Sequence, residues 1–300
     1  MTTLLDALEA GPVVLDGGFA TQLEAQGQDL SSDLWSARLL RDDPGQIVAA
    51  HRAFLDAGAR VIETATYQAS FEGFSAIGLN TVESAALLAS GADLARQAIE
   101  SFRTDGNTDD VWVAASIGPY GAILSDGSEY TGAYDLSIAE LQKFHARRLA
   151  VIAESDVDVL AFETVPKLDE VIAIVEASAD TDVPTWISIS ATGTTTRHGE
   201  SLAEAFEIAA TAPHVFALGV NCVSPHDAAA AVRIAAEYGK PVVVYPNSGE
   251  GWSAETRDWF GSGGFEPAQV NGWVESGARL IGGCCRVRPA HISAIAAALG

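Results

Sequence analysis

Short hydrophobic runs rich in β-branched residues alternate along most of the chain with longer segments of helical period. Apolar runs of about four to eight residues are typical of buried strands, whereas apolar residues spaced three and four apart are typical of helices. Helical patterns such as residues 44–58 and 137–155 separate the runs, and the "DAGA" and "ESGA" segments place glycine at a helix end just before a strand. Eight strands are predicted in this way, at 13–16, 60–64, 111–117, 157–164, 185–190, 215–222, 241–247 and 278–283.

Eight strand–helix units within 300 residues predict an α/β fold, a single (β/α)8 barrel of the TIM type. The competing architecture is an open, doubly wound sheet, which usually carries a G-x-G-x-x-G turn after its first strand. The segment in that place here reads "DGGFAT", so we favour the barrel. No proline- or serine-rich linker divides the sequence, and we expect residues 1–300 to form one domain.

The amino-acid composition and net charge limit the kinds of molecule that the protein is expected to bind. Hydrophobic residues make up 48% of the chain, enough for a large core, and 40 acidic against 17 basic residues give a formal net charge of −23. Nucleic acids and anionic membranes require basic surface, so neither is expected as a partner. The first residues lack the features of a signal peptide, and no apolar run approaches the roughly 20 residues of a membrane span. We therefore expect a cytoplasmic protein.

The three cysteines need an explanation other than a disulfide framework. Two of them, Cys284 and Cys285, are adjacent, and a disulfide between neighbours strains the peptide that joins them. An odd number would also leave one thiol unpaired. In a barrel of this type the chemistry occurs where the strands end, and both cysteines follow the eighth predicted strand, while Cys222 ends the sixth. All three are thus expected at one rim.

Three thiolates at one rim suit Zn²⁺, which accepts sulfur and prefers four ligands. Because only three cysteines are available, such a site would keep one position open, as catalytic zinc sites do. His291 falls in the predicted last helix and is not expected to be a ligand. The alternative is that the Cys-Cys pair is buried apolar filling, since its spacing matches no C-x2-C motif. Residue spacing alone leaves both interpretations open.

Longer motifs carry a resemblance to a known family. "GVNC" (219–222) followed by "IGGCCR" (281–286) resembles the zinc signature of the homocysteine S-methyltransferase family, and the similarity extends over nearly the whole chain. The fullest match is to its small stand-alone members, which use S-methylmethionine as methyl donor. The matching segments are "LDGGFATQLE" (15–24), "ETATYQAS" (63–70), "GPYGAILSDGSEYTGAY" (118–134), "FETVP" (162–166) and "VYPNSGEGW" (244–252).

The resemblance implies a (β/α)8 barrel in which Cys222, Cys284 and Cys285 hold one Zn²⁺. It implies transfer of a methyl group from a sulfonium to the thiolate of homocysteine, which forms methionine. The residues that match the family's amino-group ligands are Asp16 and Glu163. The turn amides of Gly17 and Gly18 would suit the substrate carboxylate or a close backbone approach.

Aromatic side chains in the predicted rim loops are expected to hold the sulfonium by cation–π attraction. Because their loops match family segments near the donor, Trp35 and Tyr67 rank above the other three, which are Tyr120, Tyr130 and Trp252. Glu63 either binds donor or orients a rim loop. His51, His145, His198, His214 and His226 show no partner spacing and receive no role.

S-Methylmethionine is expected to be a better donor than S-adenosylmethionine, because no glycine-rich turn with a ribose-binding acid is present. The alternatives are a selenohomocysteine or selenocysteine methyltransferase, a zinc-binding barrel without catalysis, and an unrelated barrel lyase. Two segments depart from the family pattern. Val287 and Arg288 replace threonines and remove a hydroxyl that would cap the last helix, and the loop 191–201 differs from the commoner form. Only small-molecule partners are implied.

Overall fold

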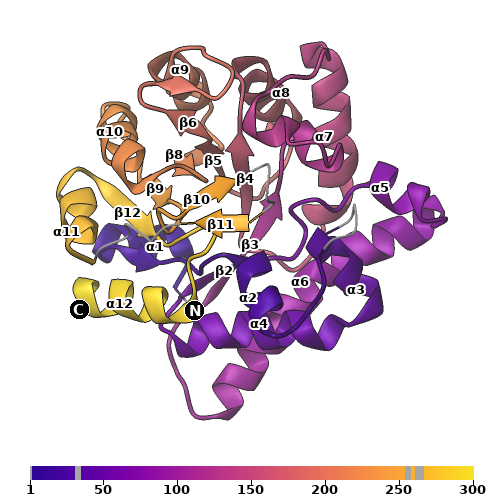
Figure 1. Cartoon of the computed structure of the whole chain (residues 1–300), viewed down its shortest axis with the longest axis horizontal. Helices are drawn as coiled ribbons and strands as arrows, with labels where there is room; N and C mark the ends of the chain where they lie inside the picture. Colours follow the sequence, from indigo (N-terminus) through magenta and orange to yellow (C-terminus); the bar gives the residue numbers. More distant parts are fainter. Residues whose placement is uncertain (1, 31–34, 254–257, 261–266) are drawn as a thin grey trace.

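The computed structural model describes residues 2–30, 35–253, 258–260 and 267–300. Its central feature is one eight-stranded sheet with the order β1-β12-β9-β8-β5-β4-β3-β2, in which all the paired strands are parallel (Figure 1). The strands of this sheet are β1 (Val13–Val14), β2 (Val61–Glu63), β3 (Trp112–Ile117), β4 (Val159–Val165), β5 (Thr185–Ile189), β8 (Val215–Asn221), β9 (Val242–Tyr245) and β12 (Ala278–Ile281).

The sheet closes on itself between β1 and β2. Leu15 forms a parallel bridge with Val61, and the Asp16 N–H donates to the Val61 carbonyl at 3.0 Å. Closure removes the free sheet edges, and the predicted (β/α)8 barrel is confirmed. The first strand, β1, is shorter than predicted, but parallel pairing continues past it: the Leu15 N–H donates to the Ile281 carbonyl, and the Asp16 carbonyl accepts from the Gly283 N–H.

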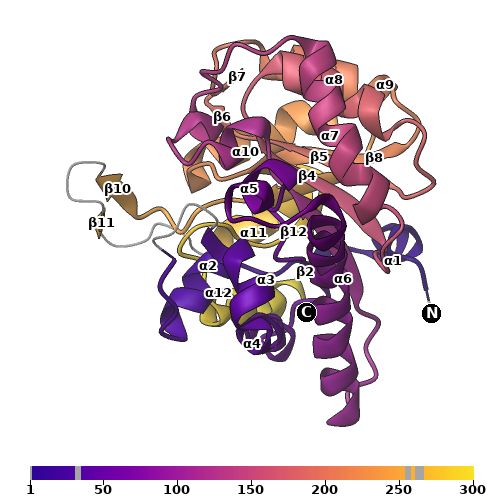
Figure 2. The same cartoon turned by 90° about the vertical axis from the view of Figure 1, so that its right-hand side faces the viewer.

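Helices surround the barrel and connect successive strands (Figures 1 and 2). The predicted helices 44–58 and 137–155 are present as α4 and α7. Gly58 and Gly277 follow their helices with φ of 104° and 111°, the left-handed conformation expected of glycine there. The remaining helices are α1 (Leu4–Ala10), α2 (Phe19–Ala25), α3 (Leu39–Asp42), α4 (Pro44–Asp56), α5 (Phe71–Ala76), α6 (Thr81–Thr104), α7 (Ile138–Ile152), α8 (Leu168–Ser178), α9 (Leu202–Thr211), α10 (Pro225–Ala236), α11 (Pro267–Glu275) and α12 (Pro289–Leu299), with short 3-10 turns η1 (Trp35–Arg38), η2 (Tyr120–Ile123) and η3 (Ser128–Tyr130).

Each strand contributes to two hydrophobic layers, because successive side chains point to opposite faces of a sheet. In β3, Trp112 and Ala114 belong to the cluster inside the barrel, whereas Val113 and Ala115 pack against the helices. Helix α1 adds Leu4 and Leu8 to the inner cluster. The Trp112 indole N–H also donates to the Thr2 carbonyl, so the N-terminal segment fills one end of the barrel and leaves the other for a pocket.

Two antiparallel hairpins, which the strand prediction did not include, lie outside the barrel sheet. One pairs β6 (Ala191–Thr192) with β7 (Thr195–Thr196) inside the atypical loop 191–201. The other pairs β10 (Gly251–Ser253) with β11 (Asp258–Phe260) and stands away from the barrel (Figure 2). Both were missed because their strands are only two or three residues long, too short for a hydrophobic alternation to register.

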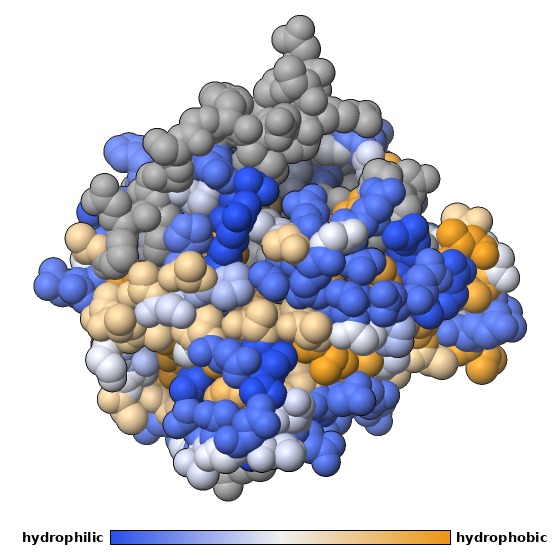
Figure 3. Space-filling view, turned by 60° about the horizontal axis from the view of Figure 1, so that its bottom comes forward, coloured by the Kyte–Doolittle hydropathy of each residue, from blue (hydrophilic) through white to orange (hydrophobic). Residues whose placement is uncertain are grey.

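Figure 3 shows one face, on which hydrophilic residues are interspersed with small hydrophobic patches. Across the described residues, no helix combines the length and hydropathy needed to cross a membrane. The exposed large hydrophobic side chains in those residues are Leu5, Ile77, Val82, Leu124 and Tyr130.

Candidate metal centre and substrate pocket

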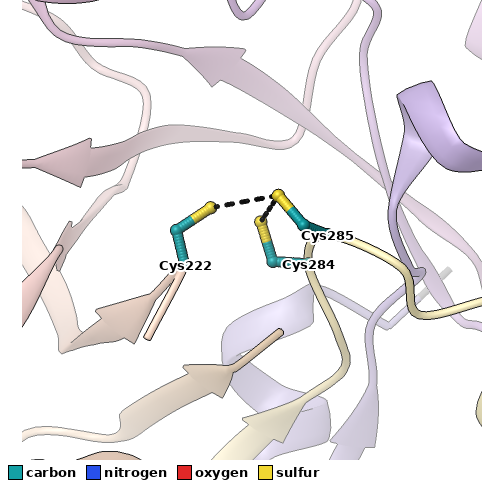
Figure 4. A group of neighbouring side chains, drawn as sticks. All are labelled: Cys222, Cys284 and Cys285. Carbon is teal, nitrogen blue, oxygen red and sulfur yellow. Dashed lines mark hydrogen bonds between the residues drawn. The ribbon is translucent and has the colours of Figure 1, made fainter. Parts of the chain in front are cut away.

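The three cysteines meet at the carboxyl ends of the strands. Cys222 directly follows β8, and Cys284 and Cys285 follow β12 (Figure 4). The Cys285 sulfur lies 3.9 Å from the Cys222 sulfur and 3.9 Å from the Cys284 sulfur. All three sulfurs lie within 4.8 Å of one another, and all three cysteines are free thiols. Strands that are not neighbours in the sheet thus bring together thiols that are more than 60 residues apart in sequence.

The sulfur geometry fits a tetrahedral metal. Four ligands at about 2.3 Å from Zn²⁺ place two thiolate sulfurs about 3.8 Å apart. The observed 3.9 Å is close to that value and far from the roughly 2.05 Å of a disulfide. Three soft sulfur donors also match the preference of Zn²⁺ rather than that of Mg²⁺ or Ca²⁺. The residues present therefore fit a single zinc ion with one position left for another ligand.

Backbone conformation and neighbouring side chains orient the cysteines. Cys222 has a φ of 50°, a left-handed conformation that is strained for a residue with a side chain. The Arg197 guanidinium of the β6–β7 segment donates to the Cys222 carbonyl at 3.2 Å, so the atypical loop does contact the site. The Cys285 N–H donates to the Asn247 side-chain oxygen, and the Cys284 N–H donates to the Pro246 carbonyl. Loops from three strands thereby hold the thiol cluster.

The glycine pair after β1 packs directly against the cysteine turn. A Cβ on Gly18 would lie 2.5 Å from the Cys284 carbonyl oxygen, and one on Gly17 would lie 2.7 Å from the Val287 carbonyl oxygen. Only glycine allows this approach. The Gly18 N–H donates to the Val287 carbonyl at 2.9 Å, so it is already used within the protein. The close backbone approach is therefore present at this turn, and binding of a substrate carboxylate by its amides stays a prediction.

Three carboxylates lie at the ends of β1, β2 and β4, and we call Asp16, Glu63 and Glu163 the rim acids. Their exposed fractions are 1%, 9% and 6%. The Glu63 N–H donates to one Asp16 oxygen at 2.9 Å, but the other Asp16 oxygen and one Glu63 oxygen have no hydrogen-bond partner in the described part of the chain. The rim acids are therefore buried without full compensation from the fold.

Side chains from two further strands hold Glu163. The Ser116 hydroxyl donates to one of its oxygens, and the Asn221 amide lies 3.4 Å from the other. Asn221 also accepts from the Thr164 N–H at 2.6 Å and donates to the Thr164 hydroxyl at 2.8 Å. Because Asn221 precedes Cys222, one side chain connects the carboxylate to the metal centre.

The electrostatics of the rim acids favour a cation. Burial raises the pKa of Glu163 from its usual 4.5 to about 7, against the lowering effect of hydrogen bonds from Ser116 and Tyr245. Burial and repulsion from Glu163 also raise the pKa values of Asp16 and Glu63. Each carboxylate is thus costly to ionise unless a positive group binds between them. The arrangement suits an ammonium group.

One pocket joins the thiols, the glycine turn and two of the rim acids. Tyr67 and Tyr130 contribute aromatic surface to it, whereas Tyr120 packs edge-on against Phe144 and Tyr134, with ring centroids 5.1 and 5.5 Å away. The side chains of Trp35 and Trp252 lie outside the described residues. The lining residues are Gly17, Gly18, Phe19, Ala20, Thr21, Glu63, Thr64, Ala65, Tyr67, Ser116, Tyr130, Glu163, Thr164, Cys222, Gly283, Cys284 and Cys285.

A second buried acidic group, which the sequence did not reveal, lies behind the rim loop 118–134. Glu170 of α8 accepts hydrogen bonds from the Tyr120 N–H at 2.7 Å, from His145 at 2.9 Å and from the Tyr134 hydroxyl. Arg148 lies 2.9 Å from the other His145 nitrogen and donates to the Gly118 carbonyl at 2.7 Å. We call Glu170, His145 and Arg148 the brace. His145 is one of the histidines to which sequence patterns gave no role.

Burial lowers the pKa of His145, so the imidazole is neutral. Its Nε2–H then donates to Glu170, and its Nδ1 accepts from Arg148. The last helix shows a similar use of histidine: His291 Nδ1 accepts from the Arg288 N–H, in place of the missing threonine cap.

Comparisons with known proteins agree with this site. Residues 13–299 match the family model for homocysteine S-methyltransferase. The chain is 39% identical over 306 residues to homocysteine S-methyltransferase 2 of Arabidopsis thaliana, which covers 95% of this chain and 92% of that protein. It is 38% identical to a selenocysteine Se-methyltransferase of Brassica oleracea var. italica, with 95% and 88% covered.

A solved structure extends the agreement to three dimensions. The metallated form of the homocysteine methyltransferase MmuM from Escherichia coli superposes with a TM-score of 0.88 at 37% sequence identity, covering 98% of this chain and 99% of that one. Family model, relatives and structure thus agree over nearly the whole length. The chain belongs to the homocysteine S-methyltransferase family of enzymes.

Proposed function

We propose that this protein is a zinc-dependent enzyme that transfers a methyl group from S-methylmethionine to homocysteine, forming methionine. The observation that carries the proposal is a cluster of three thiols, with sulfurs within 4.8 Å, in the same pocket as the buried carboxylates Glu63 and Glu163. One Glu63 oxygen has no partner in the described residues, and burial raises the pKa of both side chains. A thiol-binding metal and an ammonium-binding acid are the two features that an aminothiol substrate requires.

Cys222, Cys284 and Cys285 would hold the metal. When bound there, Zn²⁺ would keep a substrate thiol deprotonated near neutral pH, although a free thiol has a pKa of roughly 8.5. Three cysteine thiolates offset the charge of the ion, so a further thiolate in the open position would remain electron-rich and nucleophilic. Storage of metal would need the sulfurs alone and gives no reason for the rim acids beside them.

Glu163 and Asp16 would bind the homocysteine ammonium group. Asn221 and Ser116 fix Glu163 in place, so the amino acid head is held while its sulfur reaches the cysteine cluster. Such positioning converts the transfer into a reaction between prealigned groups, with the reacting atoms roughly 3–3.5 Å apart before transfer.

The methyl transfer itself needs no acid from the protein. The homocysteine sulfur attacks the methyl carbon, the bond between that carbon and the sulfonium sulfur breaks, and its electron pair stays on the leaving sulfur. With S-methylmethionine, both products are methionine. The neutral leaving thioether takes no proton, which agrees with a pocket that offers carboxylates rather than an obvious general acid.

The donor proposal depends on size. The Tyr67 and Tyr130 rings line a small pocket next to the thiols, which suits an amino acid sulfonium better than an adenosyl group. S-Adenosylmethionine would then be accepted more slowly. A selenol acceptor is the second candidate, which the similarity to a selenocysteine Se-methyltransferase favours.

The test is the metal content of the purified protein, followed by methionine formation from homocysteine with each donor. We expect about one zinc per chain and a higher kcat/KM for S-methylmethionine than for S-adenosylmethionine. Selenocysteine in place of homocysteine tests the second candidate. Zinc-free protein that is fully active, or a preference for S-adenosylmethionine, would contradict the proposal.

A further inference from the structure

A fourth acidic side chain lies beside the pocket, on a different element from the rim acids. Glu129 belongs to the short η3 turn of the rim loop, and only 6% of it is exposed. Its Oε2 atom has no hydrogen-bond partner among the residues that the structure describes. A buried carboxylate oxygen left in this way is unfavourable unless a ligand compensates it. Glu129 is therefore a ligand-binding candidate that lies in the matching segment 118–134 but has received no individual role.

The backbone around Glu129 is firmly held. A Cβ on Gly121 would lie 2.5 Å from the Glu129 nitrogen, so η2 and η3 pack backbone to backbone. The Gly132 N–H donates to the Ser128 carbonyl at 2.8 Å, and the Asp126 carboxylate accepts from the Ser128 N–H at 2.9 Å. The position of Glu129 is thus fixed by the fold of the loop.

The surroundings of Glu129 place its charge on the thiol side of the pocket. Its neighbour Tyr130 lines that pocket together with the cysteines. Burial and then the nearby charges of Asp126 and Cys285 raise the pKa of Glu129. Tyr67 lines the same pocket as Tyr130 and the cysteines. Burial and repulsion from Cys222 and Glu129 raise the pKa of Tyr67.

The two proposed substrates differ in their cations. Homocysteine has one, its ammonium, for which the rim acids are available. A sulfonium donor has a second, permanent charge on sulfur, and its methyl group must come within roughly 3–3.5 Å of the acceptor sulfur. The sulfonium, not the distant amino acid head, is therefore the part of the donor nearest the cysteines. A buried carboxylate next to Tyr130, whose side chain lines the thiol pocket together with Tyr67, is suited to that charge.

We propose that Glu129 binds the sulfonium charge of the methyl donor, with Tyr67 and Tyr130 beside it. The assignment rests on the proposed function, because it takes the donor to be a sulfonium. It adds a specificity-determining residue: Glu129 distinguishes the charged donor from its neutral thioether product and favours release of that product after transfer.

The test compares Glu129→Gln with the wild-type enzyme in its metal-loaded form. We expect the KM for S-methylmethionine to rise about 10- to 100-fold, because one charge-assisted contact is lost. The KM for homocysteine and the metal content should stay unchanged. Methionine, used as an inhibitor competitive with the donor at saturating homocysteine, carries the same ammonium but no sulfonium. Its inhibition constant should not change in the variant.

Two further variants control for the loop. Asp126→Asn removes a neighbouring charge but keeps an oxygen that accepts from Ser128, and it should leave the donor KM within about threefold. Glu129→Asp retains the charge and should recover most of the affinity. An unaltered donor KM in Glu129→Gln, or an equal loss for donor and methionine, would overturn the proposal.

A failure of the proposed function would remain distinguishable. In that case the wild-type enzyme forms no methionine with either donor. Calorimetric titration of S-methylmethionine into wild-type and Glu129→Gln protein still decides the role of Glu129, because binding is measured without turnover. Equal affinities, or no binding to either protein, would contradict the assignment.

Discussion

The rim acids and the brace are both buried carboxylate sites, yet the fold treats them in opposite ways. Glu170 of the brace is fully buried and accepts from His145, Tyr120 and Tyr134. Asp16 and Glu63 at the rim each keep an oxygen without a partner in the described residues. The protein thus supplies hydrogen-bond partners for the Glu170 carboxylate, whereas the free oxygens of Asp16 and Glu63 are available to a bound ligand.

The pKa shifts express the same contrast. Burial acts to raise the pKa of Glu170, but hydrogen bonds from His145, Tyr134 and Tyr120 outweigh it, and the net pKa is lowered. At the rim burial prevails, and the pKa of Glu163 rises to about 7. A carboxylate whose partners come from the protein stabilises the fold, whereas one that lacks them is poised to bind a cation. Burial alone therefore does not separate structural from functional acids. The balance between burial and hydrogen bonding does, since Glu163 has partners in Ser116 and Asn221 and its pKa is still raised.

The largest effect is expected from a substitution in the metal centre, which should change metal binding and activity without changing the rim acids or the brace. Cys285→Ser should lower zinc affinity by more than about 100-fold and abolish activity, because a ligand contributes at least as much as the groups that orient ligands. Metal content and methionine formation measure the loss. The midpoint of thermal unfolding, compared with metal-free wild-type protein, should stay nearly unchanged because the thiols lie at the rim. Retention of a full zinc equivalent would show that the three cysteines do not act together.

The next effect concerns the brace. Glu170→Gln removes the charge that receives three hydrogen bonds, and we expect the free energy of unfolding to fall by about 2–4 kcal/mol. Chemical unfolding measures the change, and Glu176→Gln on the exposed side of the same helix is the control. Since the brace contacts the rim loop, some loss of donor affinity is also expected. A stability equal to that of the control would remove the distinction between the two acidic groups.

The contrast also explains what the sequence could predict. Strand ends collect the polar residues of a (β/α)8 barrel, so Asp16, Glu163 and the cysteines could be placed at the rim from hydrophobic periodicity and family motifs. The brace could not be predicted, because His145, Arg148 and Glu170 lie on two different helices with no motif in common. Only their three-dimensional packing brings these side chains together.

Local backbone contacts could not be predicted from the sequence either. The close approach of Gly18 to the Cys284 carbonyl depends on the relative position of β1 and β12, which lie far apart in the sequence and pair only in the folded sheet. The sequence therefore indicated a glycine turn but not that its amide was already used. Glu129 lies in the matching segment 118–134, but its burial could not be predicted, because a glutamate in a polar loop looks solvated until the fold buries it.

A smaller effect is expected in the pH dependence of stability. The carboxyl groups of the unfolded chain have ordinary pKa values, whereas those of the rim acids in the folded state are raised. Between the ordinary and the raised pKa values, the folded state therefore binds more protons than the unfolded state. Stability in the absence of substrate should therefore fall as the pH rises from about 4.5 to about 7, by about 1–3 kcal/mol. Unfolding in denaturant across this range measures the slope.

The brace contributes with the opposite sign. Because the pKa of folded Glu170 is lowered, its contribution is present above the usual carboxyl range and is lost as the pH falls through that lowered value. Glu163→Gln should flatten the slope between pH 4.5 and 7, whereas Glu170→Gln should leave that slope unchanged. A slope that is equal in wild type and Glu163→Gln would mean that Glu163 is not buried uncompensated.

The central claim is tested most directly by measuring homocysteine affinity and unfolding free energy together in Glu163→Gln at pH 8, with metal content as the control. The account predicts that the affinity falls about 10- to 150-fold, through loss of a charge-assisted contact with the ammonium. It also predicts that stability stays the same or rises, because the variant removes a buried charge whose hydrogen bonds do not outweigh the cost of burial. An unchanged affinity, or a loss of stability like that expected for Glu170→Gln, would contradict it.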